Sequence, residues 1–156
     1  MTVNDPNDPI DRSGDQAEDA AAAELRSASW ETLNLNQKVA GHFPVFDLVV
    51  HQGADRALIQ VRGTKTDHGS YRTPPQQARR AELFGQWLGR PALYAFVHFT
   101  ADSTTVRFET ASRVATLAEA AEADYPGINR YHVSIDQFDV DASRIAELLD
   151  PPSSSA

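Results

Sequence analysis

The feature that most constrains this chain is the stretch FDLVVHQGADRALIQVRGTK, residues 46–65. It holds two mostly apolar, β-branched segments, 45–50 and 56–63, around the short polar segment HQGAD. This arrangement is typical of a β-hairpin, because β-branched residues favour strands and a short glycine-containing segment favours a tight turn. We therefore expect two antiparallel strands whose turn lies between Gly53 and Ala54.

Polar side chains interrupt both strands of this hairpin. The expected register places Asp47 opposite Gln60, and Arg62 shares the face of Gln60 because strand residues two apart point the same way. Lys65 follows just beyond the strand end. The pattern predicts a carboxylate, an amide and a guanidinium at one patch. The alternative is structural: a buried aspartate needs a partner, and Asp47 would then bond to neighbouring backbone or to Arg62.

The remaining segments alternate between helical and extended patterns. We expect helices at 16–27, 73–88, 110–123 and 142–149, and further strands at 32–39, 92–99, 104–108 and 130–135. The order describes an α/β fold with a mixed central sheet, an αβββαβ core and an extra C-terminal strand and helix. The acidic segment 1–15 and the tail 151–156 are expected to be disordered, leaving one domain at 16–150.

The segment 73–88 carries clear helix boundary signals. Thr73 is expected to cap the helix, Pro74 suits the first helical position, and Gly89 suits the end. The spacing of apolar residues predicts a buried stripe made of Ala81, Phe84 and Leu88, flanked by Trp87.

Composition excludes several classes of protein. The chain has no cysteine, so disulfides, thiolate catalysis and cysteine–zinc sites are excluded, and a cytoplasmic location is expected. The five histidines show no zinc-binding spacing. The first 20 residues lack the pattern of a secretory signal, and no apolar run is long enough for a membrane helix.

Charge is unevenly distributed along the chain. The net charge is −8, yet residues 56–90 hold seven basic and two acidic residues, a local net charge of +5. A basic block next to the polar patch suits a phosphate-bearing ligand such as nucleic acid. Solvated surface arginines are the alternative explanation. The residues expected to contact nucleic acid are Tyr71, Arg72, Arg79 and Arg80.

The motifs in PVFDLVV and LIQVRGT, with the polar loop, helix and apolar strand that follow, resemble bacterial members of the PD-(D/E)XK, or restriction-endonuclease-like, superfamily of nucleases. The resemblance covers residues 32–99 well. It implies the restriction-endonuclease-like fold and phosphodiester hydrolysis with Mg²⁺ or Mn²⁺. The family's catalytic positions would be occupied by Asp47, Gln60, Arg62 and Lys65. The metal ligands would be Asp47, Gln60 and Glu24 of the first helix.

Two substitutions depart from the family pattern. Gln60 stands where the family has an acid, and Arg62 stands where it has lysine. An amide brings no charge to a metal, and arginine stays protonated and cannot act as a base, although Lys65 could substitute for the lysine. Three functions remain open: a metal-dependent nuclease, in which case a homodimer is plausible; an inactive member that binds nucleic acid or protein; and a module that binds a protein partner through its acidic tails.

Overall fold

The computed structural model describes residues 9–35, 45–124 and 131–149, with side chains from residue 15 onward. One five-stranded sheet has the order β1-β2-β3-β5-β6, and β4 and β7 form a separate two-stranded sheet. The strands are β1 (Glu31–Asn34), β2 (Leu48–Gln52), β3 (Asp55–Thr64), β4 (Ser70–Arg72), β5 (Ala92–Phe99), β6 (Thr104–Thr110) and β7 (His132–Ser134).

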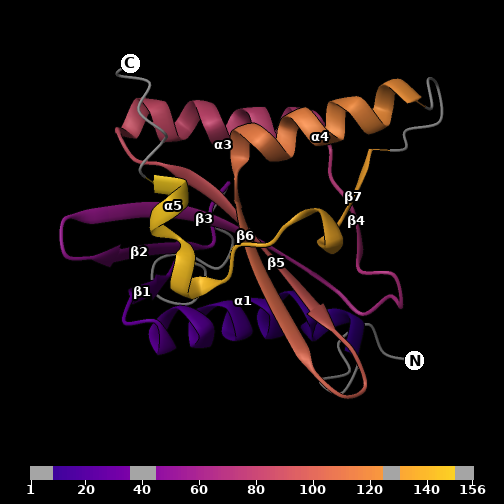
Figure 1. Cartoon of the computed structure of the whole chain (residues 1–156), viewed down its shortest axis with the longest axis horizontal. Coiled ribbons are helices and arrows are strands. Elements are labelled where there is room, and N and C mark those ends of the chain that lie inside the picture. The colour runs from indigo at the N-terminus through magenta and orange to yellow at the C-terminus, as the bar shows by residue number, and fades with distance from the viewer. Residues whose placement is uncertain (1–8, 36–44, 125–130, 150–156) are drawn as a thin grey trace.

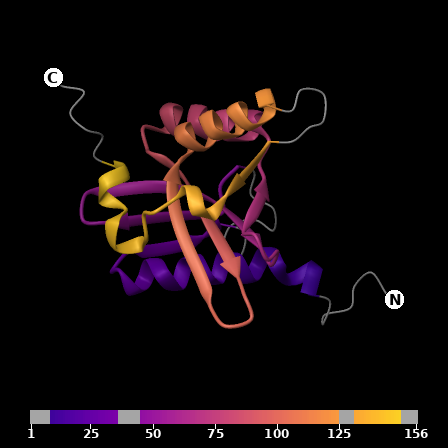
Figure 2. The same cartoon turned by 45° about the vertical axis from the view of Figure 1, so that its right-hand side comes forward.

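Helices cover both faces of the main sheet, as Figures 1 and 2 show. The helix α1 lies on one face, and α3 with α4 lies on the other. The helices are α1 (Pro9–Ser27), α3 (Pro75–Leu88), α4 (Ala111–Asp124) and α5 (Ala146–Leu149), with 3-10 turns η1 (Ile135–Gln137) and η2 (Ala142–Arg144). None of the helices in the described ranges is both long and apolar enough to cross a membrane.

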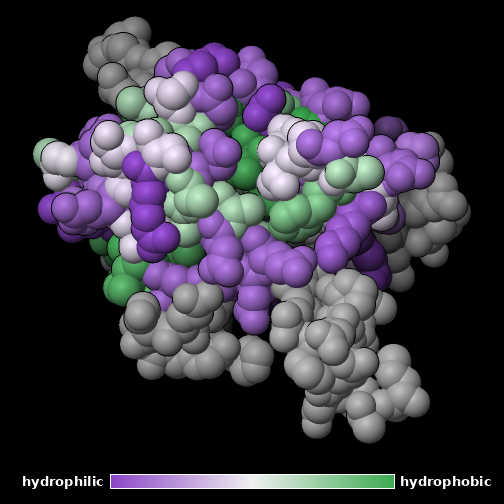
Figure 3. All heavy atoms as spheres, turned by 90° about the horizontal axis from the view of Figure 1, so that it is seen from below, coloured by the Kyte–Doolittle hydropathy of each residue, from purple (hydrophilic) through white to green (hydrophobic). Residues whose placement is uncertain are grey.

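The alternation of side chains along the strands divides the core into two layers. Ile59 and Val61 of β3 pack with Leu25 of α1, whereas Leu58 packs with α3 and α4. The central strands β3 and β5 are covered on both faces, and β5 is accordingly apolar over most of its length, whereas Gln60 and Arg62 interrupt the apolar residues of β3. Seen from the α1 side, hydrophilic side chains are interspersed with paler and apolar ones (Figure 3).

The expected elements are found in the expected order with one addition, the short strand β4, and the main sheet is mixed as expected. The strand expected at 130–135 is β7, which pairs with β4 outside the main sheet. The neighbouring strands β3 and β5 are parallel, and the other pairs of the main sheet are antiparallel. Short turns join β2 to β3 and β5 to β6, which makes these pairs antiparallel, whereas the helix α3 lies in the connection from β3 to its parallel neighbour β5.

Several boundaries differ from the expectation. The first helix begins at Pro9, so the part of the segment 1–15 from residue 9 onward is helical. Proline suits the start of a helix, because a backbone N–H at that position would have no partner within the helix. The strand expected at 32–39 ends at Asn34, and residues 36–39 lie outside the described residues. The tail 151–156 also lies outside them. The expected final helix is divided into η2 and α5.

Two expectations about α3 are wrong. Thr73 does not cap the helix, because its hydroxyl donates to the carbonyl of Tyr71 and the capping position is held by Pro74. Trp87 is 70% exposed and Leu88 is 57% exposed, whereas Ala81 is buried as expected and Phe84 is partly buried against the core. The residues that α3 buries fully against the sheet and α4 are small. Those residues are Pro75, Ala78, Ala81 and Gly85.

Candidate functional site

The β2–β3 hairpin has the register expected from the sequence. Leu48 pairs with Ile59 and Gln52 pairs with Asp55, so the turn consists of Gly53 and Ala54. Gly53 has φ of 59°, a left-handed conformation that glycine adopts at little cost. Continuing this register by one residue places Asp47 beside Gln60.

Asp47 lies where the regular pairing of β2 begins. Its backbone N–H donates to Ile59 at 2.8 Å, and its carbonyl accepts from Leu35 at 2.8 Å. Its Oδ2 accepts the backbone N–H of Val61 at 2.7 Å. Because β3 continues beyond the last backbone pair with β2, the Val61 N–H is satisfied by this carboxylate. Asp47 therefore has the structural role that the sequence left as an alternative.

The side chains of Gln60 and Arg62 lie on the face of β3 that points toward α3 and α4, since they alternate with Ile59 and Val61 of the α1 layer. In the parallel pairing with β5, Gln60 lies opposite Tyr94, which is 1% exposed. Burial raises the pKa of Tyr94 to about 12; the charge of Arg62 opposes this rise and that of Asp47 adds to it. The charges of Arg62 and Asp47 thus both act on the buried phenol of Tyr94.

Arg62 links this site to the small second sheet. Its Nη2 donates to the carbonyl of Arg72 in β4 at 2.6 Å. A guanidinium has five N–H donors, so one bond to a carbonyl leaves most of them for another acceptor. Because arginine keeps its proton in proteins, Arg62 provides positive charge and donors to this site but no base.

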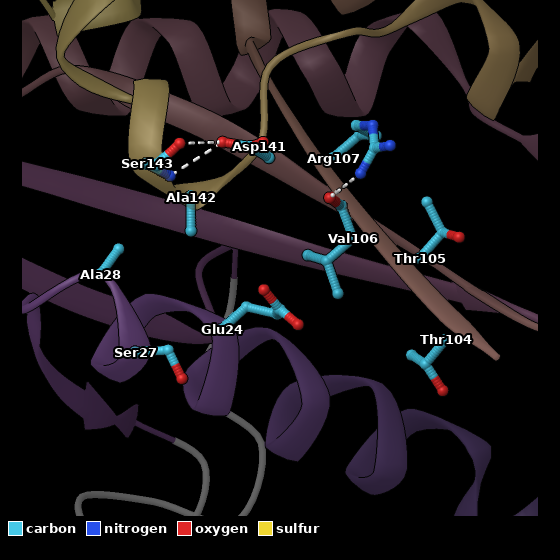
Figure 4. A pocket seen from close by; sticks show the side chains of 10 residues that line it. All are labelled: Glu24, Ser27, Ala28, Thr104, Thr105, Val106, Arg107, Asp141, Ala142 and Ser143. Atoms are coloured by element: carbon cyan, nitrogen blue, oxygen red, sulfur yellow. Dashed lines mark hydrogen bonds between the residues drawn. The ribbon is translucent and has the colours of Figure 1, made fainter.

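Lys65 and Glu24 are not brought to this group. Lys65 is exposed beyond the end of β3 and lines a hollow of about 420 Å³ with residues of its own loop and of the β5–β6 turn. Glu24 is exposed on α1, which covers the opposite face of the sheet. Figure 4 shows its carboxylate in a different hollow, of about 440 Å³, between α1, β6 and η2.

The residues at the site do not fit a divalent metal. Within the described ranges, no three His, Cys, Asp or Glu side chains come together as metal ligands. Of the polar side chains on this face of β3, Gln60 is a neutral amide and Arg62 is a cation, whereas Mg²⁺ is held by carboxylates together with water and substrate oxygens.

Two of the four residues expected to contact nucleic acid have other roles. Tyr71 is 3% exposed and its ring lies 4.8 Å from that of Phe96, so it cannot stack on a base. Its hydroxyl is buried without a hydrogen-bond partner among the described residues, and this burial raises its pKa. Arg79 joins α3 to α4 by binding Glu119 at 2.6 Å and also contacts Glu82; these bonds raise its pKa.

Arg72 and Arg80 are exposed, and their contact with nucleic acid stays a prediction. Sequence reasoning missed the neighbours of Arg72. The guanidinium of Arg72 lies 5.2 Å from the ring centre of Tyr131, and Arg72 pairs with His132 in the small sheet. Strands of three residues are too short to show alternation, so the pattern gave no signal for this pairing.

The arrangement of a mixed sheet between α1 and the α3–α4 pair is the restriction-endonuclease-like fold that the motif resemblance implied. The structure is similar to that of Hjc, a Holliday junction resolvase from the archaeal hyperthermophile Archaeoglobus fulgidus. The TM-score is 0.59 at 15% sequence identity, covering 85% of this chain and 99% of that one. No family model and no curated protein matches the sequence.

Proposed function

We propose that this chain is a nucleic-acid-binding domain that uses the Asp47–Gln60–Arg62 side of a nuclease fold to hold phosphate without metal-dependent hydrolysis. The observation that carries the proposal is the position of Arg62, which shares a face of β3 with Gln60 and is fixed to β4 by its bond to the Arg72 carbonyl. The similarity to a Holliday junction resolvase supports nucleic acid as the ligand class.

Arg62 suits phosphate binding for a physical reason. Its planar guanidinium presents pairs of N–H donors whose spacing matches two phosphate oxygens, and the bond to Arg72 holds its orientation. Within the described residues no carboxylate forms an ion pair with Arg62, whereas Arg79, Arg113 and Arg144 are each paired with glutamate. Arg62 therefore retains its charge for a ligand.

The donor set argues against hydrolysis. Asp47 gives one of its oxygens to the Val61 N–H, Gln60 brings no charge, and Arg62 cannot accept a proton. Lys65 and Glu24, which the family resemblance would recruit, line other hollows. Metal-dependent cleavage of nucleic acid by this chain would therefore contradict the proposal.

The test is a binding and cleavage assay on the whole chain. Labelled duplex DNA, single-stranded DNA, single-stranded RNA and a four-way DNA junction are incubated with the protein in EDTA, Mg²⁺ or Mn²⁺. We expect at least one probe to be bound equally well in EDTA and to stay intact in all three conditions. Arg62→Ala should weaken binding about tenfold or more, as expected for loss of a hydrogen bond to a charged group.

Two further variants make the result specific. Arg56→Ala is the matched control, because Arg56 is an exposed arginine at the hairpin tip whose guanidinium donates to nearby backbone carbonyls. It removes the same charge as Arg62→Ala and should change binding little. Asp47→Asn should leave binding within a few-fold of wild type. Cleavage that requires metal and disappears in Asp47→Asn would overturn the proposal.

A further inference from the structure

We propose that the outer face of the β4–β7 sheet is a second phosphate-contacting surface, in which Arg72 stacked on Tyr131 continues the path of nucleic acid away from Arg62. This inference rests on the proposed function and names the surface that the ligand crosses. Figures 1 and 2 both show β4 and β7 side by side at the edge of the molecule.

The pairing of β4 with β7 places some of their side chains on a buried face and others on an exposed face. Tyr71 pairs with Val133, and both are buried against the main sheet. Arg72 pairs with His132, and both are exposed. Because neighbouring residues of a strand point to opposite faces, the outer face of this sheet presents a guanidinium beside an imidazole.

Both ends of the small sheet are held in place. At one end the N–H of Thr73 donates to the carbonyl of Tyr131 at 3.1 Å. At the other end the N–H of Ile135 donates to the carbonyl of Gly69 at 2.9 Å. Gly69 has φ of 56°, and a Cβ there would lie 2.6 Å from the Ile135 side chain. The outer face is thus carried on a fixed backbone, which lowers the entropy lost on binding.

The guanidinium of Arg72 is oriented but not neutralised. It lies 5.2 Å from the centre of the Tyr131 ring, a cation–π contact that holds the group and leaves its charge intact. Within the described part of the chain, no carboxylate forms an ion pair with it, in contrast to Arg79. An exposed, oriented arginine without a carboxylate partner suits a phosphate oxygen.

Arg72 and Arg62 are also physically connected. The bond from Arg62 Nη2 to the Arg72 carbonyl, 2.6 Å long, joins the site on the main sheet to the backbone of the small sheet. A nucleic-acid strand that contacts Arg62 would therefore find a second cation on the adjoining element. Two fixed cations on adjoining strands bind a polyanion better than either alone, since each phosphate contact adds its own release of counterions.

The experiment measures the affinity and its salt dependence for the probe that binds wild type best. Arg72→Gln removes the charge and keeps a polar side chain of similar length. We expect binding about tenfold or more weaker at low salt. The plot of the logarithm of the association constant against the logarithm of the salt concentration has a negative slope. Its magnitude should decrease by about 0.9 for duplex or about 0.7 for a single strand, as expected for the loss of one phosphate contact.

Tyr131 supplies a matched pair of variants. Tyr131→Phe keeps the aromatic face under Arg72 and should leave affinity and salt slope unchanged. Tyr131→Leu removes the ring and should weaken binding in the direction of Arg72→Gln. Thermal unfolding of each variant shows whether it is folded; if Tyr131→Leu is not, Arg72→Gln decides the question, because its side chain is exposed.

The outcomes separate the two proposals. Wild-type protein that binds none of the probes overturns both. Binding that falls in Arg62→Ala but is unchanged in Arg72→Gln overturns the surface proposed here and leaves the proposed function standing. Loss of affinity in both variants, with Arg56→Ala close to wild type, supports both.

Discussion

Replacing Asp47 should cost stability through one particular hydrogen bond. In the wild type, Oδ2 of Asp47 accepts the N–H of Val61 at 2.7 Å, at a point where β3 has run past its backbone pairing with β2. Asp47→Ala leaves this N–H without its acceptor. Hydrogen bonds to charged groups contribute about 1.5–3 kcal/mol, and an unsatisfied buried donor costs about 1–3 kcal/mol. We therefore expect a loss of about 2–3 kcal/mol for Asp47→Ala.

Asp47→Asn is the control, because its side-chain oxygen still accepts from Val61 while the charge is removed. It should lose less than half as much as Asp47→Ala. Urea unfolding followed by circular dichroism gives both values, and thermal midpoints should fall by about 2–4 °C per kcal/mol for a chain of this size. Equal losses in the two variants, or a change within about 0.5 kcal/mol for Asp47→Ala, would refute a structural role for this acceptor.

Three further predictions concern stability. Glu109→Ala should cost about 1–3 kcal/mol in urea unfolding, because buried Glu109 accepts from the Thr110 N–H and binds Arg113 at 2.5 Å; a change below about 0.5 kcal/mol would contradict this. Phe96→Ala should cost about 3–5 kcal/mol and Trp87→Ala less than about 0.5, since Phe96 is fully buried and Trp87 is 70% exposed; the reverse order would be contrary evidence. Burial raises the pKa of Tyr94 from 10.0 to about 12, so the neutral phenol contributes fully to the free energy of unfolding below pH 10, and this contribution is lost as the pH rises toward 12. Tyr94→Phe should therefore lessen the decline in unfolding free energy at alkaline pH. An identical decline in the variant and the wild type would count against this.

The hairpin was predictable because its signals are local. The β-branched segments and the short turn determine which residues are paired, and a slip of one residue would turn every apolar side chain to the wrong face. The predicted position of Asp47 next to Gln60 depends only on this register. The role of its carboxylate was one of two alternatives, since the sequence does not show where the backbone pairing of β2 begins.

Features that depend on distant segments were not predictable in the same way. The β4–β7 pairing joins residues about sixty positions apart through strands of three residues, so no periodicity marks it. The burial of Tyr71 and the contact of Arg72 with Tyr131 both follow from that pairing. Trp87 was misassigned because an apolar residue at helical spacing usually faces the core, and here small residues fill that side of α3.

The role expected for Glu24 depended on the placement of α1. The family resemblance made it a metal ligand, but α1 covers the face of the sheet opposite to Gln60 and Arg62. A helix of this composition carries exposed glutamates whatever its neighbours, so the sequence could not distinguish a ligand from a solvated side chain. The topology decides the matter, and it separates Glu24 from Asp47.

The central claim is that Arg62 binds a phosphate of nucleic acid at a site that does not hydrolyse the phosphodiester bond. The most direct measurement follows one labelled probe with excess protein in Mg²⁺, Mn²⁺ and EDTA, reading complex formation and strand length from the same samples. We predict a salt-sensitive complex in all three conditions, weakened by Arg62→Ala, with the strand intact throughout. Strand scission that appears only with metal and vanishes in Asp47→Asn would contradict the claim.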